Sequence, residues 1–479
     1  MNTEKSIVLI GFGPHAKRIY MSFLQKYNVI PKLIIELYSK KNDINSYLIE
    51  HDLHTRCIFI PDEEKDYNNL SEQTKQKIRA HISELHITHA IISTEPKAHF
   101  AYINFFLDNE INILTDKPIT APTNVSNDKD MAKRIETEYY SILNKYLTVK
   151  NNGVLLEVQC QRRWHLGYIF VHDELKKIVS KYGIPITSIQ VTHSDGMWNM
   201  PDEFIFRENH PYKYGYGKLF HSGYHFIDLL SWLVSINDQL PRVKAESLET
   251  YASIVRPSDY LNMINNEFYR TTLKTEKFDE IFNQLGDLHF NRYGEIDVYS
   301  VIRFLNDNNV ITTATLNLMQ NSFSRRSWDT LPQDTYKANG RVRHEYLNVQ
   351  VGPLMSIQVH SYQAKEIKDR NTDGSCNIGE CEHFDIYIFK NIDILGGVPF
   401  EKISISDLFK SQRIDNFMGY NEYAREKCFL DFINNDSDGM QIFMHQLGIR
   451  LMRNMYESVC SSANDENPLI KSAVPNKLI

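Results

Sequence analysis

The chain has 479 residues, of which 42% are hydrophobic and 24% are charged, ordinary values that exclude a disordered, collagen-like or disulfide-scaffold protein. At about 150 residues per domain, this length suggests two large domains or three smaller ones. The 53 Lys and Arg residues against 60 Asp and Glu residues give a net charge of −7, so a nucleic-acid or anionic-membrane partner has no electrostatic support.

Short apolar runs alternate with helical patterns over roughly the first 120 residues. Strands are predicted at residues 6–10, 32–37, 57–60, 88–93 and 111–114. Helices are predicted between them, at residues 16–27, 71–85 and 99–107. Because strands that alternate with helices pair in parallel, this order predicts an α/β fold with a doubly wound parallel sheet.

The pattern changes in the second part of the chain. A long polar helix is predicted at residues 128–147, followed by a strand at residues 153–160. Longer strands rich in Val, Ile and Thr are predicted at residues 186–193, 299–305, 310–318 and 354–362, with turns between some of them that indicate an antiparallel sheet. The last strong helix is predicted at residues 441–459.

These patterns predict two domains and a tail. We place the first domain at residues 1–150 and the second at residues 151–460. Residues 461–479 are polar, and we expect them to form a loose C-terminal tail.

The N-terminus and the cysteines favour a cytoplasmic protein. No positively charged stretch followed by an apolar run opens the chain, so no signal peptide is expected. No window approaches the roughly 20 apolar residues of a membrane span. The six cysteines are scattered, which fits free thiols in a reducing compartment.

A glycine-rich turn lies between the first predicted strand and its helix. It consists of Gly11, Phe12, Gly13, Pro14, His15 and Ala16. Gly11 tolerates the tight turn, Gly13 lets the backbone approach a pyrophosphate, and Ala16 is small where helix meets strand. Since the helix N-terminus also favours phosphate charge, we expect a dinucleotide site here, with a merely structural turn as the alternative.

Glu36 ends the second predicted strand, 25 residues after Gly11. An acidic side chain there accepts hydrogen bonds from the adenosine ribose and repels a 2′-phosphate. Ser39, Lys40 and Lys41 follow closely and could instead hold that phosphate. We therefore expect NAD as cofactor, with NADP as the alternative.

Two further segments follow strands of the predicted parallel sheet. Lys117 follows the fifth strand at its carboxyl end, where open α/β sheets bind ligands. We expect it to point into the crevice beside the nicotinamide, although a surface lysine is the alternative. Thr94 and His99 follow the fourth strand. Thr94 is expected to bind the cofactor, and His99 either to touch the cofactor or to start the next helix.

Residues 217–233 hold the strongest candidates for catalysis. His221, His225 and Asp228 are spaced by four and three residues, which places them on one face of a helix. A histidine has a pKa near neutrality and is suited to act as general base beside a substrate hydroxyl. A core or capping role is the alternative.

Metal ligation is not expected. His221 and His225 have a spacing that could bind a metal, but no further ligands accompany them. Cys376, Cys381 and His383 lack a fourth ligand at suitable spacing, so we expect a surface loop there.

Taken together, these motifs resemble the Gfo/Idh/MocA oxidoreductases, named for glucose–fructose oxidoreductase and inositol dehydrogenase. Residues 8–16 are similar to the family's first strand and glycine loop, and residues 90–99 to its fourth-strand segment. Residues 116–118 match the Glu-Lys-Pro signature with aspartate in place of glutamate. Residues 217–228 resemble the segment Gly-x-Leu-x-Asp-x-Gly-x-His-x-x-Asp.

The resemblance implies an N-terminal Rossmann domain followed by an α/β domain with a large, open, mostly antiparallel sheet. It also implies NAD(P)-dependent hydride transfer at a hydroxyl-bearing carbon of a small-molecule substrate such as a sugar or cyclitol. A homodimer or homotetramer is expected, since an open sheet face usually needs a partner.

The resemblance also assigns residue roles. Lys117 and His225 would be the catalytic pair, with His225 taking the hydroxyl proton and Lys117 stabilising charge on the oxygen. His221 would be a second acid/base or a substrate anchor. Arg163, a weaker match, and Asp228 would contact substrate.

Two departures from the family pattern leave an alternative open. His221 stands where most active members have an aspartate, and the polar residues 262–291 look like an insertion. Because fold does not fix function, the alternative is a non-catalytic NAD(P)-binding sensor or regulator.

Overall fold

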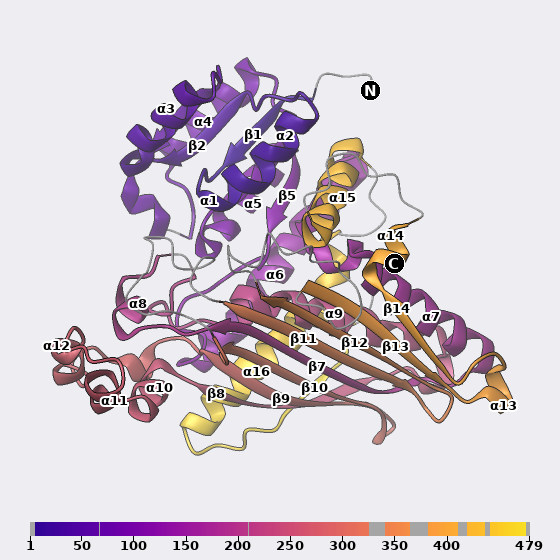
Figure 1. Cartoon of the computed structure of the whole chain (residues 1–479). Helices are drawn as coiled ribbons and strands as arrows, with labels where there is room; N and C mark the ends of the chain where they lie inside the picture. Colours follow the sequence, from indigo (N-terminus) through magenta and orange to yellow (C-terminus); the bar gives the residue numbers. More distant parts are fainter. Residues whose placement is uncertain are drawn as a thin grey trace.

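Figure 1 shows the computed structural model, which describes residues 5–66, 68–208, 210–324, 341–364, 382–410, 419–435 and 441–475. The described residues form a six-stranded sheet and a nine-stranded sheet. The six-stranded sheet lies at the top of Figure 1, and the nine-stranded sheet runs along the bottom.

The six-stranded sheet is parallel throughout and has the order β3-β2-β1-β4-β5-β6. Its strands are β1 (Ile7–Ile10), β2 (Leu33–Leu37), β3 (Arg56–Ile60), β4 (His89–Ile92), β5 (Asn112–Asp116) and β6 (Leu156–Gln159). The helices around it include α3 (Lys41–Glu50), α4 (Glu72–Glu84), α5 (His99–Asp108) and α6 (Lys129–Val149). Every residue of β1 and β4 is buried, as expected for central strands covered on both faces. The predicted doubly wound sheet is confirmed.

The nine-stranded sheet has the order β14-β13-β12-β11-β7-β10-β9-β8-β15. Its strands are β7 (Ile186–Met197), β8 (Ser247–Val255), β9 (Asp297–Asn306), β10 (Asn309–Asn321), β11 (Val342–Val351), β12 (Met355–Ala364), β13 (Glu382–Lys390), β14 (Phe400–Ser404) and β15 (Ile470–Ala473). Only the pairing of β7 with β10 is parallel among these strands, so the expected large, mostly antiparallel sheet is confirmed.

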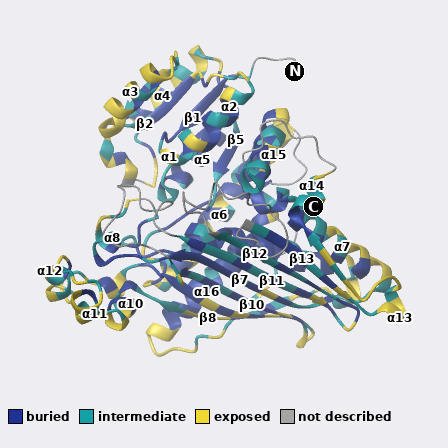
Figure 2. Cartoon of the chain, in the orientation of Figure 1, coloured by how far each residue is buried: buried dark blue, intermediate teal, exposed yellow. Residues whose placement is uncertain are grey.

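Helices cover one face of the nine-stranded sheet. They are α7 (Leu166–Tyr182), α9 (Tyr224–Val234) and α16 (Gln446–Ala463). Ser458 of α16 accepts a hydrogen bond of 2.9 Å from the main chain of Ala252 in β8, which fixes this helix to the sheet. Figure 2 shows that the strands are mostly buried, whereas the outer helices expose one side.

Two features of the structure differ from what the sequence predicted. β6 follows residue 150 yet pairs with β5 in the parallel sheet; the division of the chain at residue 150 stays a prediction. The expectation of a loose tail is wrong for β15, which pairs antiparallel with β8. Its Ser472 accepts a hydrogen bond from Asn454 of α16, so a polar segment is held as an edge strand.

The insertion expected at residues 262–291 forms a small helical lobe at the lower left of Figure 1. Its helices are α10 (Pro257–Met263), α11 (Asn266–Thr271) and α12 (Asp279–Asn283), next to α8 (Pro201–Phe206). Tyr269 and Phe278 are buried there against Met200. The lobe therefore has an apolar core of its own. No helix within the described residues is long and apolar enough to cross a membrane.

Candidate functional site

The glycine loop connects β1 to a helical run that continues from α1 (Pro14–Ala16) through a π-helical turn (Lys17–Met21) to α2 (Ser22–Lys26). Gly11 has a φ of +82°, and a Cβ there would lie 2.5 Å from the main-chain oxygen of Ser93. Gly13 precedes the first helical residue, and a Cβ there would meet nothing within 4 Å. The loop thus leaves open space at the N-terminus of a helix, as a pyrophosphate requires.

Glu36 lies directly beside this loop. Its carboxylate accepts hydrogen bonds of 2.7 Å from the main-chain N–H groups of Phe12 and Leu37. Phe12 is buried, with its ring 5.2 Å from that of Tyr47. These hydrogen bonds fix the end of β2 and the glycine loop to each other.

Two of the three residues considered for a 2′-phosphate have other contacts. The main-chain N–H of Ser39 donates to the carboxylate of Asp62 at 3.1 Å, and the Ser39 hydroxyl donates to the same carboxylate. The Lys41 ammonium lies 5.5 Å from the ring centre of Tyr38.

Thr94 and His99 have different positions. The main-chain nitrogen of Thr94 lies 2.8 Å from where a Cβ on Gly11 would be, so Thr94 borders the crevice. His99 is fully buried; its Nδ1 faces the carbonyl of Pro118 at 2.7 Å and its Nε2 faces that of Thr94 at 3.2 Å. His99 therefore links the loops after β4 and β5, and its contact with Pro118 lies next to Lys117 in the chain.

Lys117 brings the two parts of the chain together. Its Nζ donates a hydrogen bond of 2.5 Å to the main-chain carbonyl of His221. Burial lowers the pKa of Lys117 to about 8, although the nearby Asp116 carboxylate opposes this effect. Asp116 itself accepts hydrogen bonds from Tyr20 at 2.5 Å and from Ser93 at 2.6 Å. The carboxyl edge of the parallel sheet thus presents a lysine that is close to losing its proton.

His221 lies at a kink in the π-helical turn η7 (Leu219–Gly223), where its ψ is −114°. Its ring is packed among those of His210, Tyr212 and Tyr216, with ring centres 4.8, 5.7 and 6.0 Å away. Both ring nitrogens are buried and have no hydrogen-bond partner among the described residues. Burial holds the pKa of His221 well below its usual value, so the ring is neutral. Unpaired buried nitrogens are costly, which indicates that a ligand or water binds there.

His225 is the second residue of α9 and is buried. Its Nδ1 lies 3.9 Å from the Sγ of Cys160. Burial, followed by the positive charges of Lys117 and Arg162, holds the pKa of His225 well below its usual value. The Lys117 charge acts on the pKa of both His221 and His225, and both rings are neutral.

Arg163 and Asp228 form a buried ion pair with each other. Arg163 donates two hydrogen bonds to the Asp228 carboxylate, at 2.6 and 2.9 Å. The Nδ1 of His445 lies 3.1 Å from the same carboxylate. Burial would raise the pKa of Asp228, but Arg163 outweighs it and holds that pKa well below the usual value. Arg163 and Asp228 were expected to contact substrate. Because Asp228 is on α9 and Arg163 is on the turn at Gln161–Trp164, their ion pair fixes that helix to that turn.

Sequence reasoning missed Glu95 and Arg425. Glu95 follows Thr94, and its carboxylate accepts a hydrogen bond of 2.9 Å from Tyr216. Burial raises the pKa of Glu95 to about 7. Arg425, on α15 (Tyr420–Asn434), lies close enough to act on the pKa of Lys117. Glu95 could have been noticed as the neighbour of Thr94, whereas α15 carries no motif.

One group of potential metal ligands occurs among the described residues: Cys160, Asp228 and His445, with ligand atoms within 4.8 Å of one another. The guanidinium of Arg163 already binds both oxygens of Asp228, in the place where a cation would lie. Cys376 and Cys381, considered above with His383, lie outside the described residues.

No protein-family model matches the chain, and no match was found among the curated proteins. Solved structures with the same fold cover nearly all of it. Levoglucosan dehydrogenase in complex with NADH has a TM-score of 0.56 at 13% identity, over 99% of this chain and 100% of that chain. An oxidoreductase domain protein from Kribbella flavida has a TM-score of 0.57 at 9% identity, with the same coverage.

A third similar structure is an oxidoreductase from Agrobacterium radiobacter in complex with NAD+, L-tartaric acid and magnesium. It has a TM-score of 0.54 at 11% identity, over 98% of this chain and 99% of that chain. At such identities the likeness concerns the fold. The chain therefore shares the fold of these solved oxidoreductases.

Proposed function

We propose that this protein is an NAD(P)-dependent oxidoreductase that acts on a hydroxyl-bearing carbon of a small polar substrate such as a sugar or cyclitol. The observation that carries the proposal is the 2.5 Å hydrogen bond from Lys117 to the carbonyl of His221. It brings the proposed catalytic residues of both parts of the chain to the carboxyl edge of the parallel sheet, where α/β folds bind ligands.

Similar folds support this proposal. Levoglucosan dehydrogenase was solved with NADH and levoglucosan, and another similar structure is a putative myo-inositol dehydrogenase from Sinorhizobium meliloti. A third is an aldose–aldose oxidoreductase from Caulobacter crescentus in complex with glycerol. All three names describe chemistry at a polyol or sugar, which is the chemistry that Lys117 and the histidines suit.

The glycine loop fits a dinucleotide. The space at Gly13 and the helix N-terminus after it suit the pyrophosphate, and Glu36 suits the adenosine ribose. Thr94 borders the same crevice. The bound nicotinamide would supply or accept the hydride. We propose NAD over NADP because the Glu36 carboxylate lies 2.7 Å from the main-chain nitrogen of Phe12 in the loop, where it would repel a 2′-phosphate.

Lys117 and His225 would act on one substrate oxygen, and their pKa values favour a different division of roles from the one expected from sequence. With a pKa of about 8, Lys117 is the group that can exchange a proton near neutral pH. His225 is neutral, because its pKa is held low, and it suits a hydrogen bond that orients the hydroxyl. The Lys117 ammonium would also stabilise negative charge on that oxygen.

His221 would anchor the substrate through its unpartnered ring nitrogens. In this proposal the His221 ring takes over the role of the aspartate that, by the family resemblance, most active members have at this position. The contact between Lys117 and His221 supports the catalytic proposal over the alternative of a non-catalytic sensor.

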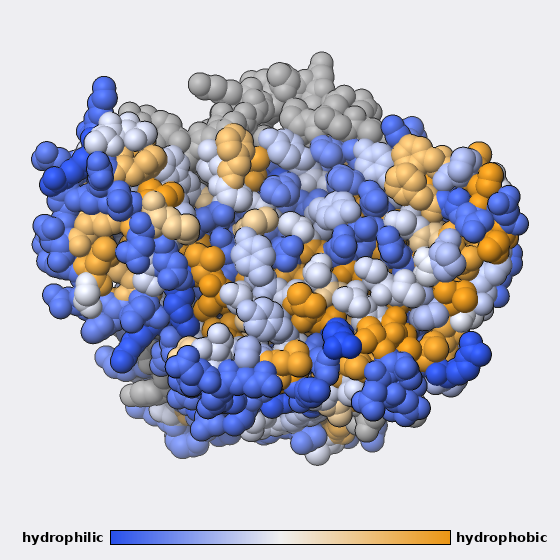
Figure 3. Space-filling model, turned by 90° about the horizontal axis from the view of Figure 1, so that it is seen from below, coloured by the Kyte–Doolittle hydropathy of each residue, from blue (hydrophilic) through white to orange (hydrophobic). Residues whose placement is uncertain are grey.

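We also propose that the protein forms a homodimer or homotetramer through the open face of the nine-stranded sheet. Figure 3 views the molecule from that side and shows hydrophobic groups between polar ones. Exposed apolar side chains on its strands include Tyr251, Tyr299, Val301, Val310, Phe389 and Phe400. Analytical ultracentrifugation tests this: a monomer at micromolar concentration would contradict it.

The function is tested by incubating the protein with NAD+ and a panel of sugars and polyols while NADH formation is followed. We expect turnover with at least one compound, and loss of turnover without loss of NADH binding in Lys117→Met. If NADH binds with no turnover on any compound in either direction, the sensor alternative replaces the proposal.

A further inference from the structure

Arg425, on α15, lies beside the carboxyl edge of the parallel sheet. Its main-chain carbonyl accepts a hydrogen bond of 3.3 Å from the side chain of Gln159, the last residue of β6. Gln159 is in register with Asp116, the last residue of β5, and Lys117 follows Asp116 in the chain. A guanidinium from the last part of the chain therefore joins the edge that carries Lys117.

The same helix packs along the helical run that follows the glycine loop. Glu426 of α15 lies 2.7 Å from the ammonium of Lys26 at the end of that run. At the first turn of α15, Glu422 lies 3.5 Å from Arg18 in the π-helical turn. The first turn of α15 is thus fixed a few residues after the glycine loop.

Arg425 shares its carboxylate partner with a second arginine. The Arg425 side chain is 16% exposed, and among the described residues its guanidinium bonds only Glu422, at 3.2 Å. Arg18 lies against the same Glu422 oxygen. Because an arginine has five N–H donors, Arg425 keeps donors for a further anion, to which charge-assisted hydrogen bonds are strong.

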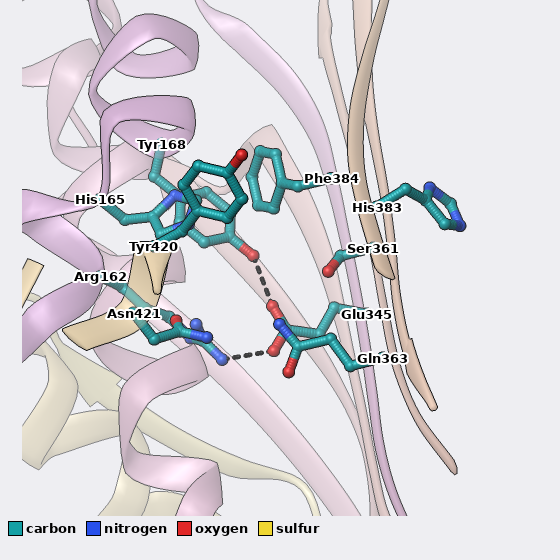
Figure 4. A pocket seen from close by; sticks show the side chains of 10 residues that line it. All are labelled: Arg162, His165, Tyr168, Glu345, Ser361, Gln363, His383, Phe384, Tyr420 and Asn421. Atoms are coloured by element: carbon teal, nitrogen blue, oxygen red, sulfur yellow. Dashed lines mark hydrogen bonds and ion pairs between the residues drawn. The ribbon is translucent and has the colours of Figure 1, made fainter. Parts of the chain in front are cut away.

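A second shared carboxylate lies next to the start of α15. Figure 4 shows Arg162 bound to Glu345 in the lining of a small pocket, to which Asn421 of α15 also contributes. The Arg162 hydrogen bond is 2.6 Å long, and Arg343 also donates to Glu345. Two guanidinium groups again share one carboxylate.

A third carboxylate is shared in the same way. Asp195, on β7, accepts hydrogen bonds from the Lys218 ammonium at 2.6 Å and from Arg341. Lys218 directly precedes η7, the turn that carries His221. The six cations and three carboxylates of these groups therefore carry a net positive charge.

This charge reaches the two histidines proposed to contact the substrate. Burial is the main cause of the low pKa of His225, and the charges that lower it further are those of Lys117, Arg162, Arg425 and Arg343. Burial also dominates the low pKa of His221, followed by the effects of His210, Lys117, Arg207 and Lys218. The whole chain has a net charge of −7, so this positive region is local, and such a region attracts anions.

Two anions could meet Arg425: a group on the substrate or the pyrophosphate of the cofactor. Burial lowers the pKa of His15 in the glycine loop, and the Arg425 charge adds to this effect. The loop, however, has its own means of binding a pyrophosphate, the open helix N-terminus after Gly13. Arg425 acts as well on Lys117 and His225, the pair proposed to contact the substrate oxygen. The substrate is therefore the favoured source of the anion.

We propose that the substrate is anionic, a sugar or cyclitol that carries a carboxylate or a phosphate, and that Arg425 binds this group while Lys117 and His225 act on a hydroxyl of the same molecule. This inference rests on the proposed function, because it takes Lys117 and His225 as the residues that contact the substrate.

The test is isothermal titration calorimetry on the full chain in saturating NAD+. Each neutral sugar is compared with its own acids: glucose with glucuronate, gluconate and glucose 6-phosphate, and galactose with galacturonate and galactose 6-phosphate. We expect at least one acid to bind about tenfold or more tightly than its neutral parent, as a hydrogen bond to a charged group gives. The carboxylate and phosphate arms identify which anion is bound.

Substitutions of Arg425 test the location. Arg425→Met should remove the gain of the acid over its neutral parent, while the affinity for NADH stays the same. Lys427→Met is the matched control, because it removes a positive charge from an exposed position of the same helix, and it should keep the gain. Arg425→Gln removes the charge but keeps a hydrogen-bonding side chain beside Glu422, and it serves if Arg425→Met does not fold.

Three results would overturn the inference. The first is that no acid binds more tightly than its neutral parent, and the second is a gain that survives the loss of the Arg425 charge. The third is a tenfold or larger fall in the NADH affinity of Arg425→Met, which would place the cofactor pyrophosphate at Arg425. Failure of the proposed function is distinguishable, because it shows as absent turnover or absent NADH binding, whereas the gain of the acid is measured without turnover.

Discussion

The side chain of Lys117 donates a hydrogen bond of 2.5 Å to the main-chain carbonyl of His221. The lysine follows the fifth strand of the parallel sheet, whereas the histidine belongs to the turn before α9. Because 104 residues separate them, this contact brings two distant segments to one crevice. Both His221 ring nitrogens are buried there and have no hydrogen-bond partner among the described residues.

The first prediction concerns pH. Burial lowers the pKa of Lys117 to about 8, so its ammonium is present below that pH and is lost above it. If the ammonium supplies the proton during carbonyl reduction, the single-turnover rate should fall as pH rises through about 8. Lys117→Met should lower the rate by about 10²–10⁴-fold and abolish this inflection. An inflection that persists in the variant would assign the proton to another group.

Substitutions of His221 distinguish two explanations for a histidine at the position where the family resemblance predicts an aspartate. If its ring anchors the substrate, His221→Ala should raise KM and lower kcat/KM, while NADH affinity stays the same. We expect His221→Asp not to restore the activity lost in His221→Ala, because a carboxylate beside Lys117 would alter the charge of the site. Higher activity of His221→Asp toward a simple polyol would instead show that the histidine has replaced the aspartate without gaining a role.

The buried ion pair of Arg163 and Asp228 should stabilise the second sheet and its helices. Asp228→Asn leaves the Arg163 charge unpaired and should cost about 3–5 kcal/mol, measured as a lower urea midpoint. Asp173→Asn, on a side chain that is 68% exposed, is the control and should change stability by less than about 0.5 kcal/mol.

The contribution of the Arg163–Asp228 ion pair to folding stability should depend on pH, and the direction follows from the pKa of Asp228. Arg163 holds the pKa of Asp228 below its usual value, so the pair contributes stability above the unfolded-state pKa. That contribution is lost as pH falls through the folded-state pKa. Acid should therefore narrow the stability difference between wild type and Asp228→Asn. A difference that is constant down to pH 2 would contradict this.

Glu36 should select against the 2′-phosphate. We expect NADPH to bind about tenfold more weakly than NADH, the effect of a like-charge contact of roughly 1–2 kcal/mol. Glu36→Gln should narrow this gap, whereas Glu50→Gln, on the exposed end of α3, should not. Tighter binding of NADPH by the wild type would reverse the assignment.

The parallel sheet was predictable because its strands are short and rich in apolar residues, such as Ile7–Ile10, and because helical patterns separate most of them. Most strands of the second sheet were missed. β8 and β11 alternate buried with half-buried or exposed residues, and their polar residues weaken the apolar signal on which prediction relies.

The site was only partly predictable for a related reason. Lys117, His221 and His225 belong to local motifs, so their sequence context indicated them. That Arg163 and Asp228 bind each other depends on packing between segments 65 residues apart. Likewise, Arg162 donates a hydrogen bond to Glu345, which is 183 residues away in the sequence. No spacing in the sequence predicts this contact.

The central claim is that the glycine loop binds a nicotinamide dinucleotide, and a fluorescence titration with NADH tests it most directly. A side chain at Gly13 meets no protein atom within 4 Å of its Cβ, so Gly13→Trp should fold and should fill the space of the pyrophosphate. We expect the wild type to bind NADH and Gly13→Trp to lose at least about tenfold in affinity, or about 1.4 kcal/mol. Equal affinity of the two proteins, or no binding by the wild type, would contradict the account.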